Sequence, residues 1–140
     1  MKVNSLAQAV VESAAQHPER VAIKIKDEVL TYSDLIQKSA QVANTLKDQG
    51  VNKEAIGIVG QRHMASYVGI LGILLAGCYY VPINPKLSKD KIISIINDSN
   101  IKFLVGDIDN FSKINQSLDD SSCKIIVKKI IPFELALEGD

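Results

Sequence analysis

Residues 56–83 read IGIVGQRHMASYVGILGILLAGCYYVPI, and this stretch decides the fold class. The run Ile56 to Val59 and the cluster Tyr79 to Ile83 are rich in β-branched and aromatic residues, which predicts two strands. Between them, Met64 to Ala76 has the length and apolar spacing of a helix that ends at Gly77. A strand, a helix and a strand in this order predict two parallel strands with the helix on one face of the sheet.

The same region raises the question of a membrane span, because no charged residue lies between Met64 and Pro85. Pro82 and the strand pattern around it interrupt the run, which leaves a helix of about 20 Å against a hydrocarbon core of about 30 Å. We therefore expect a buried helix and no membrane association. Gly69, Gly72, Ala76 and Gly77 lack bulk, and we expect them to let this helix approach the sheet closely.

Toward the carboxyl end, the alternation of helices and strands continues. Ser88 is placed to cap a helix with apolar positions Ile92, Ile93, Ile95 and Ile96, and Lys102 to Val105 predicts a further strand. After Gly106 the pattern weakens. There we expect a short helix around Phe111 to Leu118 and a last strand from Cys123 to Ile131.

Toward the amino end, Asn4 or Ser5 is placed to cap a first helix that ends at His17-Pro18. Val21, Ile23 and Ile25 form the expected buried face of a strand, which turns at Asp27-Glu28 into a small antiparallel hairpin. Thr31 and Asp34 have the spacing of a capping box at the start of a second helix. The buried stripe expected on that helix is Leu35, Ser39, Val42, Ala43 and Leu46, with the helix ending at Gly50.

These elements predict an α/β fold with a mostly parallel sheet, flanking helices and a small N-terminal β-hairpin. We expect residues 1–140 to form one domain, in which 108–140 are a weakly patterned continuation. The chain has 16 Lys and Arg against 16 Asp and Glu and contains no basic run, so nucleic acid is not an expected partner. The start lacks the apolar core of a signal peptide, and the two cysteines lack paired spacing, which predicts a cytoplasmic protein with reduced thiols.

No residue qualifies as a catalytic, cofactor-binding or metal-binding candidate. Gly57 and Gly60, like Gly69 and Gly72, lack the spacing of a phosphate-binding loop. The remaining chemistry-bearing residues have structural explanations as loop, cap or core positions: His17, His63, Ser5, Ser33, Ser66, Ser88, Asp119, Asp120, Tyr79 and Tyr80. Asp119 and Asp120 are expected in a solvated loop, and the two tyrosines in the core.

Three segments carry a resemblance to a known family. Residues 30–35, LTYSDL, resemble the first core motif of the adenylate-forming superfamily, commonly written L-T-Y-x-E-L, with Asp34 in place of the glutamate. Residues 72–85 resemble its second motif, L-K-A-G-x-A-Y-V-P-L-D-P, with Leu75 for the lysine, Tyr79 for a small residue and Asn84 for the aspartate. Residues 92–105 are similar to the helix and strand that follow, so that the likeness covers about residues 5–107.

The resemblance implies a truncated N-terminal subdomain of an adenylation fold. Complete enzymes of the family use ATP and Mg²⁺ to convert a carboxylate into an acyl-adenylate, then pass the acyl group to a thiol of a carrier protein or coenzyme A. Their phosphate loop, nucleotide contacts, substrate pocket and catalytic lysine lie downstream of the matched motifs. We therefore expect this chain to be inactive alone, with no cofactor of its own.

Several functions remain open at this stage. The first hypothesis is one part of a split or longer enzyme, which pairs with a downstream portion or another synthetase component. Residues 80–82 favour amino-acid activation, as in nonribosomal peptide synthetases, whereas Asn84-Pro85 also suits acyl-CoA ligases. The alternatives are a non-catalytic interaction module that docks on a synthetase or self-associates, and an independent ATP-binding protein. The sequence does not identify the carboxylate substrate or the partner.

Overall fold

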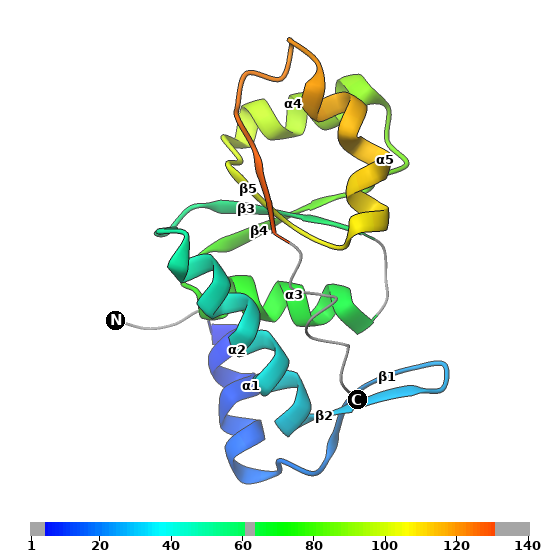
Figure 1. The fold of residues 1–140 in the computed structure, drawn as a ribbon. Coiled ribbons are helices and arrows are strands. Elements are labelled where there is room, and N and C mark those ends of the chain that lie inside the picture. Colours follow the sequence, from blue (N-terminus) through cyan, green and yellow to red (C-terminus); the bar gives the residue numbers. More distant parts are fainter. Residues whose placement is uncertain (1–4, 61–63, 131–140) are drawn as a thin grey trace.

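The structure, a computed structural model, describes residues 5–60 and 64–130. Five helices and six strands follow one another along the described chain (Figure 1). Their bounds are α1 Ser5–Gln16, β1 Val21–Ile25, β2 Glu28–Thr31, α2 Tyr32–Asp48, β3 Ala55–Val59, α3 Met64–Leu75, β4 Tyr79–Ile83, α4 Lys89–Ser99, β5 Phe103–Val105, α5 Ile108–Asp119 and β6 Lys128–Ile130. This arrangement confirms the α/β class with its parallel sheet, flanking helices and antiparallel hairpin.

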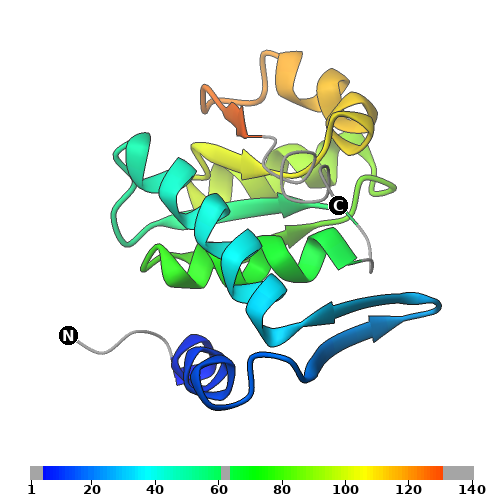
Figure 2. The ribbon, with the colours of Figure 1, turned by 60° about the horizontal axis from the view of Figure 1, so that its bottom comes forward.

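A four-stranded parallel sheet lies at the centre, with strand order β4-β3-β5-β6. Helices α2 and α3 lie on one side of it, and α4 and α5 lie on the other (Figures 1 and 2). All five residues of β3 are buried, which agrees with a strand that has a neighbour on each edge and helices on both faces. β3 is therefore the central, fully buried strand of the sheet, with neighbours on both edges.

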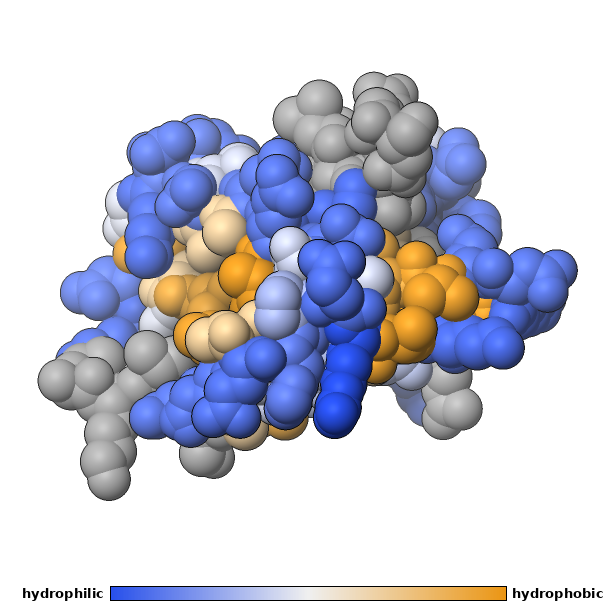
Figure 3. All heavy atoms as spheres, turned by 90° about the horizontal axis from the view of Figure 1, so that it is seen from below, coloured by the Kyte–Doolittle hydropathy of each residue, from blue (hydrophilic) through white to orange (hydrophobic). Residues whose placement is uncertain are grey.

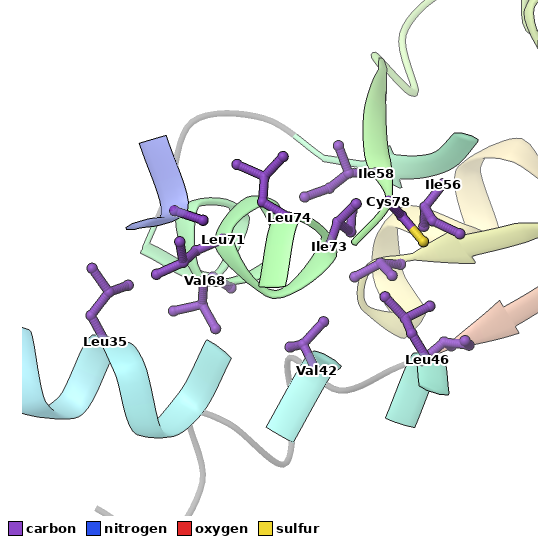
Figure 4. Close-up of a cluster of buried hydrophobic side chains, with 14 of the residues drawn as sticks. Leu35, Val42, Leu46, Ile56, Ile58, Val68, Leu71, Ile73, Leu74 and Cys78 are labelled. Atoms are coloured by element: carbon purple, nitrogen blue, oxygen red, sulfur yellow. The ribbon is translucent and has the colours of Figure 1, made fainter. Parts of the chain in front are cut away.

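Alternate residues of β3 contribute side chains to two separate hydrophobic cores. Ile56 and Ile58 join Val42, Leu46, Val68 and Ile73 on the side of α2 and α3 (Figure 4). Ala55 and Val59 join Ile92, Ile96, Phe111 and Ile114 on the side of α4 and α5. Because side chains along a strand point to opposite faces, one short strand connects both cores.

The close packing of α3 is against another helix. A Cβ atom built on Gly72 would clash with the Cβ and Cγ1 atoms of Val42 and lie 2.9 Å from the Ser39 carbonyl oxygen, both in α2. The Ser39 hydroxyl donates a hydrogen bond to the Val68 carbonyl oxygen over 3.2 Å, which joins the same two helices. The expectation that Gly72 brings α3 close to the sheet was therefore wrong, because the helix meets α2 at this position.

Most predicted boundaries and caps agree with the structure. The Thr31 side chain accepts from the Asp34 backbone N–H, and the Ser88 side chain accepts from that of Lys91, so each caps its helix as expected. All five residues of the predicted α2 stripe are buried. Ser5 is the first residue of α1, and Asn4 lies outside the described residues. In the described part of the chain, every helix falls short of the length and apolarity that a membrane crossing requires.

The N-terminal hairpin differs from its prediction in two details. The register between β1 and β2 shifts between Val21 and Ile23, so Val21 pairs with Thr31 and is 54% exposed. One extra residue in a strand reverses the alternation beyond it, which explains why Val21 does not share the buried face of Ile23. The turn is formed by Lys26 and Asp27, with Lys26 at a φ of 54°, and not by Asp27-Glu28.

The segment after Gly106 also differs from the prediction. α5 begins at Ile108, three residues earlier than expected, because the Asp107 carboxylate caps it by accepting from the Asn110 N–H at 2.8 Å. Within the expected strand from Cys123 to Ile131, only Lys128–Ile130 form β6 among the described residues, and Ile131 lies outside them. The expected strand was too long because the backbone groups of Ser122 and Lys124 are instead hydrogen-bonded to side chains of Asp120 and Asn97.

Candidate functional site

The carboxyl edge of the sheet is the first place to look for a ligand site. β3 is followed by α3 on one face and β5 by α5 on the other, and such a reversal opens a crevice in many parallel sheets. At this edge, the Gly60 N–H donates to the Ile83 carbonyl oxygen and the Gly106 N–H to that of Ile130. Asp107 is engaged as a helix cap. These residues thus have structural roles. Residues 61–63, including His63, lie outside the residues that the structure describes.

Among the glycines considered for a phosphate loop, Gly57 has a packing role, as Gly72 has, and so does Gly106, which was not a candidate. A Cβ atom on Gly57 would lie 2.5 Å from Leu104 Cδ2 and 3.0 Å from Ile83 Cδ1, so the ends of these two core side chains fill the space beside the glycine. A Cβ atom on Gly106 would lie 2.9 Å from the Val59 carbonyl oxygen. Packing therefore accounts for both glycines without a ligand.

The other sequence candidates lie apart from one another. His17 follows α1, where its backbone N–H donates to the Ser13 carbonyl oxygen. Ser66 is buried on α3, and Ser33 lies in the first turn of α2. Cys78 is buried, Cys123 is half-buried, and both thiols are free. Over residues 5–60 and 64–130, no group of three or more His, Cys, Asp or Glu side chains could hold a metal ion.

Tyr79 and Tyr80 are exposed, at 57% and 39%, so the expectation that they pack in the core was wrong. The reason is the strand order. β4 is an edge strand, and Ile83 is its one fully buried residue. The chain order of the strands does not reveal which one lies at the edge.

Asp120 has a more specific environment than the solvated loop we expected. Its Oδ2 atom lies 2.9 Å from Lys89 Nζ at the start of α4, and its Oδ1 atom accepts from the Ser122 N–H at 2.8 Å. The hydrogen bond from Lys89 and those from Ser122 lower the pKa of Asp120 to about 2. In turn, the hydrogen bond with Asp120 raises the pKa of Lys89. Asp119 ends α5, so the two carboxylates have different roles.

An apolar groove of about 200 Å³ lies between α1, the hairpin, α2 and α3. Its walls include Leu6, Val10, Ile23, Leu35, Tyr67 and Leu74. Seen from the side that carries α1, α2 and the hairpin, the surface shows two apolar areas separated by a polar band (Figure 3). Sequence reasoning missed this groove because four elements form it, and helical or strand periodicity describes only one element at a time.

Comparison with known proteins identifies the family. Residues 10–138 match the family model described as AMP-binding enzyme. The chain is 36% identical over 104 residues to bacitracin synthase 3 of Bacillus licheniformis, and 43% identical over 89 residues to gramicidin S synthase 2 of Brevibacillus brevis. These alignments cover 74% and 63% of this chain but 2% of each synthase.

Solved structures show the same fold. O-succinylbenzoate coenzyme A synthetase from Bacillus subtilis in complex with AMP superimposes with a TM-score of 0.73 at 25% identity, over 91% of this chain and 32% of that one. A nonribosomal peptide synthetase bound to α-methyl-L-serine-AMP gives a TM-score of 0.77 at 20% identity, over 99% of this chain and 15% of that one. The motifs at residues 30–35 and 72–85 had indicated this relationship. The chain belongs to the family of AMP-binding enzymes.

Proposed function

We propose that this chain supplies the amino-terminal part of an adenylating enzyme that activates an amino acid with ATP and Mg²⁺ for loading onto a carrier protein. The observation that supports the amino-acid substrate is the similarity to peptide synthases, at 36% to 43% identity. Among the solved relatives, the O-succinylbenzoate coenzyme A synthetase has been determined with ATP and magnesium ion. The remaining part of such an enzyme and its carrier protein are therefore the partners that we propose.

We further propose that the chain has no adenylating activity by itself. The described residues at the carboxyl edge of the sheet are engaged in backbone hydrogen bonds, a helix cap and core packing. None of these described residues is assigned as a nucleophile, a base or a phosphate-binding lysine. The matches with the two synthases above also cover only 2% of each synthase. The ATP site and the substrate pocket are expected in the remaining part of the enzyme.

Of the three departures from the second motif, those at Leu75 and Asn84 do not decide between amino-acid and acyl-CoA chemistry. The Asn84 Oδ1 atom accepts from the Lys86 N–H at 2.9 Å, a local turn that an aspartate oxygen would make equally well. Leu75 is half-buried and packs against the core of α2 and α3. Both residues thus have structural roles, and the preference for an amino acid rests on the peptide synthases. An acyl-CoA ligase remains the second candidate because of the fold shared with the coenzyme A synthetase.

The test is ATP–pyrophosphate exchange. The chain alone should give no exchange with any carboxylate. Mixed or fused with a downstream portion from the same genome, it should give exchange with one amino acid of a panel that also contains aryl and fatty acids. Exchange by the chain alone would refute the proposed inactivity. Exchange with a fatty or aryl acid, followed by transfer to coenzyme A, would favour the acyl-CoA ligase. A complete lack of exchange with any downstream portion would reject the proposed function.

A further inference from the structure

The hairpin carries apolar side chains on both of its faces. Ile23 and Leu30 are paired across the two strands, and Leu30 is buried against α2. On the opposite face, Val29 is 46% exposed, and Val21, which pairs with Thr31, is 54% exposed. Strands that are apolar on both faces are typical of sheets covered on both sides. Lys24 pairs with Val29 on the same face and is exposed. The outer face of this hairpin therefore presents two exposed valines beside one lysine, and the valines are its apolar contact area.

The apolar groove adjoins the inner side of the same hairpin. Ile23 forms part of its wall, and the exposed rim includes Leu6 of α1, at 56%, and Tyr67 of α3, at 39%. A volume of about 200 Å³ is large enough for one or two apolar side chains. Leaving such a groove open to water forgoes the free energy of burying apolar surface, at about 25 cal/mol per Å².

The edges of the central sheet are less suited to accept a partner. The Tyr79 N–H donates to the Glu54 carbonyl oxygen next to β3, so the polar backbone groups of Tyr80 and Pro82 face outward from β4. Pro82 has no N–H to offer there, and proline at such a position discourages strand pairing. On the other edge, β6 has only three residues, and Lys129 is the one whose backbone faces outward.

The share of a solved relative that this chain covers bears on what could cover the apolar side. The solved coenzyme A synthetase has about three times as much chain as the part that superimposes, since 91% of this chain matches 32% of that one. We propose that the groove, together with the outer face of the hairpin, is the surface on which the remaining part of the adenylating enzyme docks through apolar side chains. This inference rests on the proposed function, which requires such a partner.

The experiment measures binding of the full 140-residue chain to the downstream portion that restores ATP–pyrophosphate exchange. The double variant Leu6→Glu with Tyr67→Glu places two charges on the groove rim, and Val29→Lys places one on the outer hairpin face. Both side chains of the rim pair are exposed, so the fold should persist, as circular dichroism would verify. The expected result is a Kd raised by at least about tenfold for each variant.

Ile108→Glu is the matched control, because this isoleucine is 50% exposed at the start of α5, on the other side of the sheet. It should leave the Kd unchanged. Hydrogen exchange gives a second measurement: partner binding should protect hairpin amides and leave the Tyr80 amide of β4 unprotected. Suppose that the groove and hairpin variants bind the downstream portion, and restore ATP–pyrophosphate exchange, as well as the native chain does. The docking surface is then refuted while the proposed function stands. If no downstream portion binds the native chain, both are rejected.

Discussion

At Gly72, two helices are so close that a single methyl group is decisive. Gly72→Ala would gain about 1 kcal/mol of helix propensity, but the new Cβ would overlap Val42 and press on the Ser39 carbonyl oxygen. Overpacking in a closed interior costs about 1–3 kcal/mol, so we expect a net loss of about 1 kcal/mol in the free energy of unfolding. Urea denaturation would measure it. A gain in stability would mean that α2 and α3 separate readily.

Gly77 provides the contrast, because a Cβ atom there would meet nothing within 4 Å but φ is 80°. We expect Gly77→Ala to lose about 1 kcal/mol through left-handed strain alone, and Gly77→Asn to lose less, since asparagine tolerates this conformation. The same denaturation series separates the two mechanisms. Equal losses for alanine and asparagine at position 77 would show that backbone conformation is not the cause.

The contact of Asp120 with Lys89 makes a pH-dependent contribution. The folded pKa of about 2 lies below 3.8, the ordinary pKa of an aspartate, so the stabilisation is present above pH 3.8 and is lost as the pH falls toward 2. In Lys89→Met, the largest cause of the shift is absent, and the pKa of Asp120 should rise toward 3.8 while the Ser122 hydrogen bonds still hold it lower. Carboxyl NMR titration measures this directly. An unchanged pKa in the variant would assign the shift to Ser122.

At the scale of elements, the sequence predicted a feature correctly when the interactions that determine it lie within one helix or strand. Thr31, Ser88 and the apolar stripe of α2 act within one helix, and their positions were predictable from spacing. Val21 and the Tyr79-Tyr80 pair were misplaced because a bulge and the strand order determine their burial. The groove was not predictable, since its walls come from α1, the hairpin, α2 and α3 together. Non-local pairing is the information that a single sequence pattern lacks.

The edge strand β4 supplies a prediction at this scale. Pro82→Val would add an outward N–H to an exposed edge and raise β propensity, with little change to the buried interior, because Pro82 is exposed. We expect the variant to self-associate more strongly than the native chain, as sedimentation over a range of concentrations would show. Pro82→Lys is the control, since it restores the N–H but adds a charge that opposes pairing. Identical sedimentation of all three chains would contradict a protective role for the proline.

For the whole molecule, β3 is the element that links the two hydrophobic cores. Ile56→Ala removes a fully buried side chain from the core of α2 and α3, and such truncations cost about 2–5 kcal/mol out of a total of about 5–15 kcal/mol. Because Ala55 and Val59 of the same strand belong to the other core, loss of β3 should release α4 and α5 as well. We therefore expect the substitution to lower the stability of both sides together.

Native-state hydrogen exchange of single amides would test this coupling. In Ile56→Ala, the slowest amides of α2 and α4 should lose protection by the same free energy, since both then exchange through one global opening. Ile92→Ala, placed in the opposite core, should have the reciprocal effect on α2. If Ile56→Ala accelerates exchange only in α2 and α3, the two sides unfold independently and β3 does not unite them. Equal losses on both sides would mean that a partner docking on the groove stabilises the distant core too, because anything that binds only the native state opposes the shared opening.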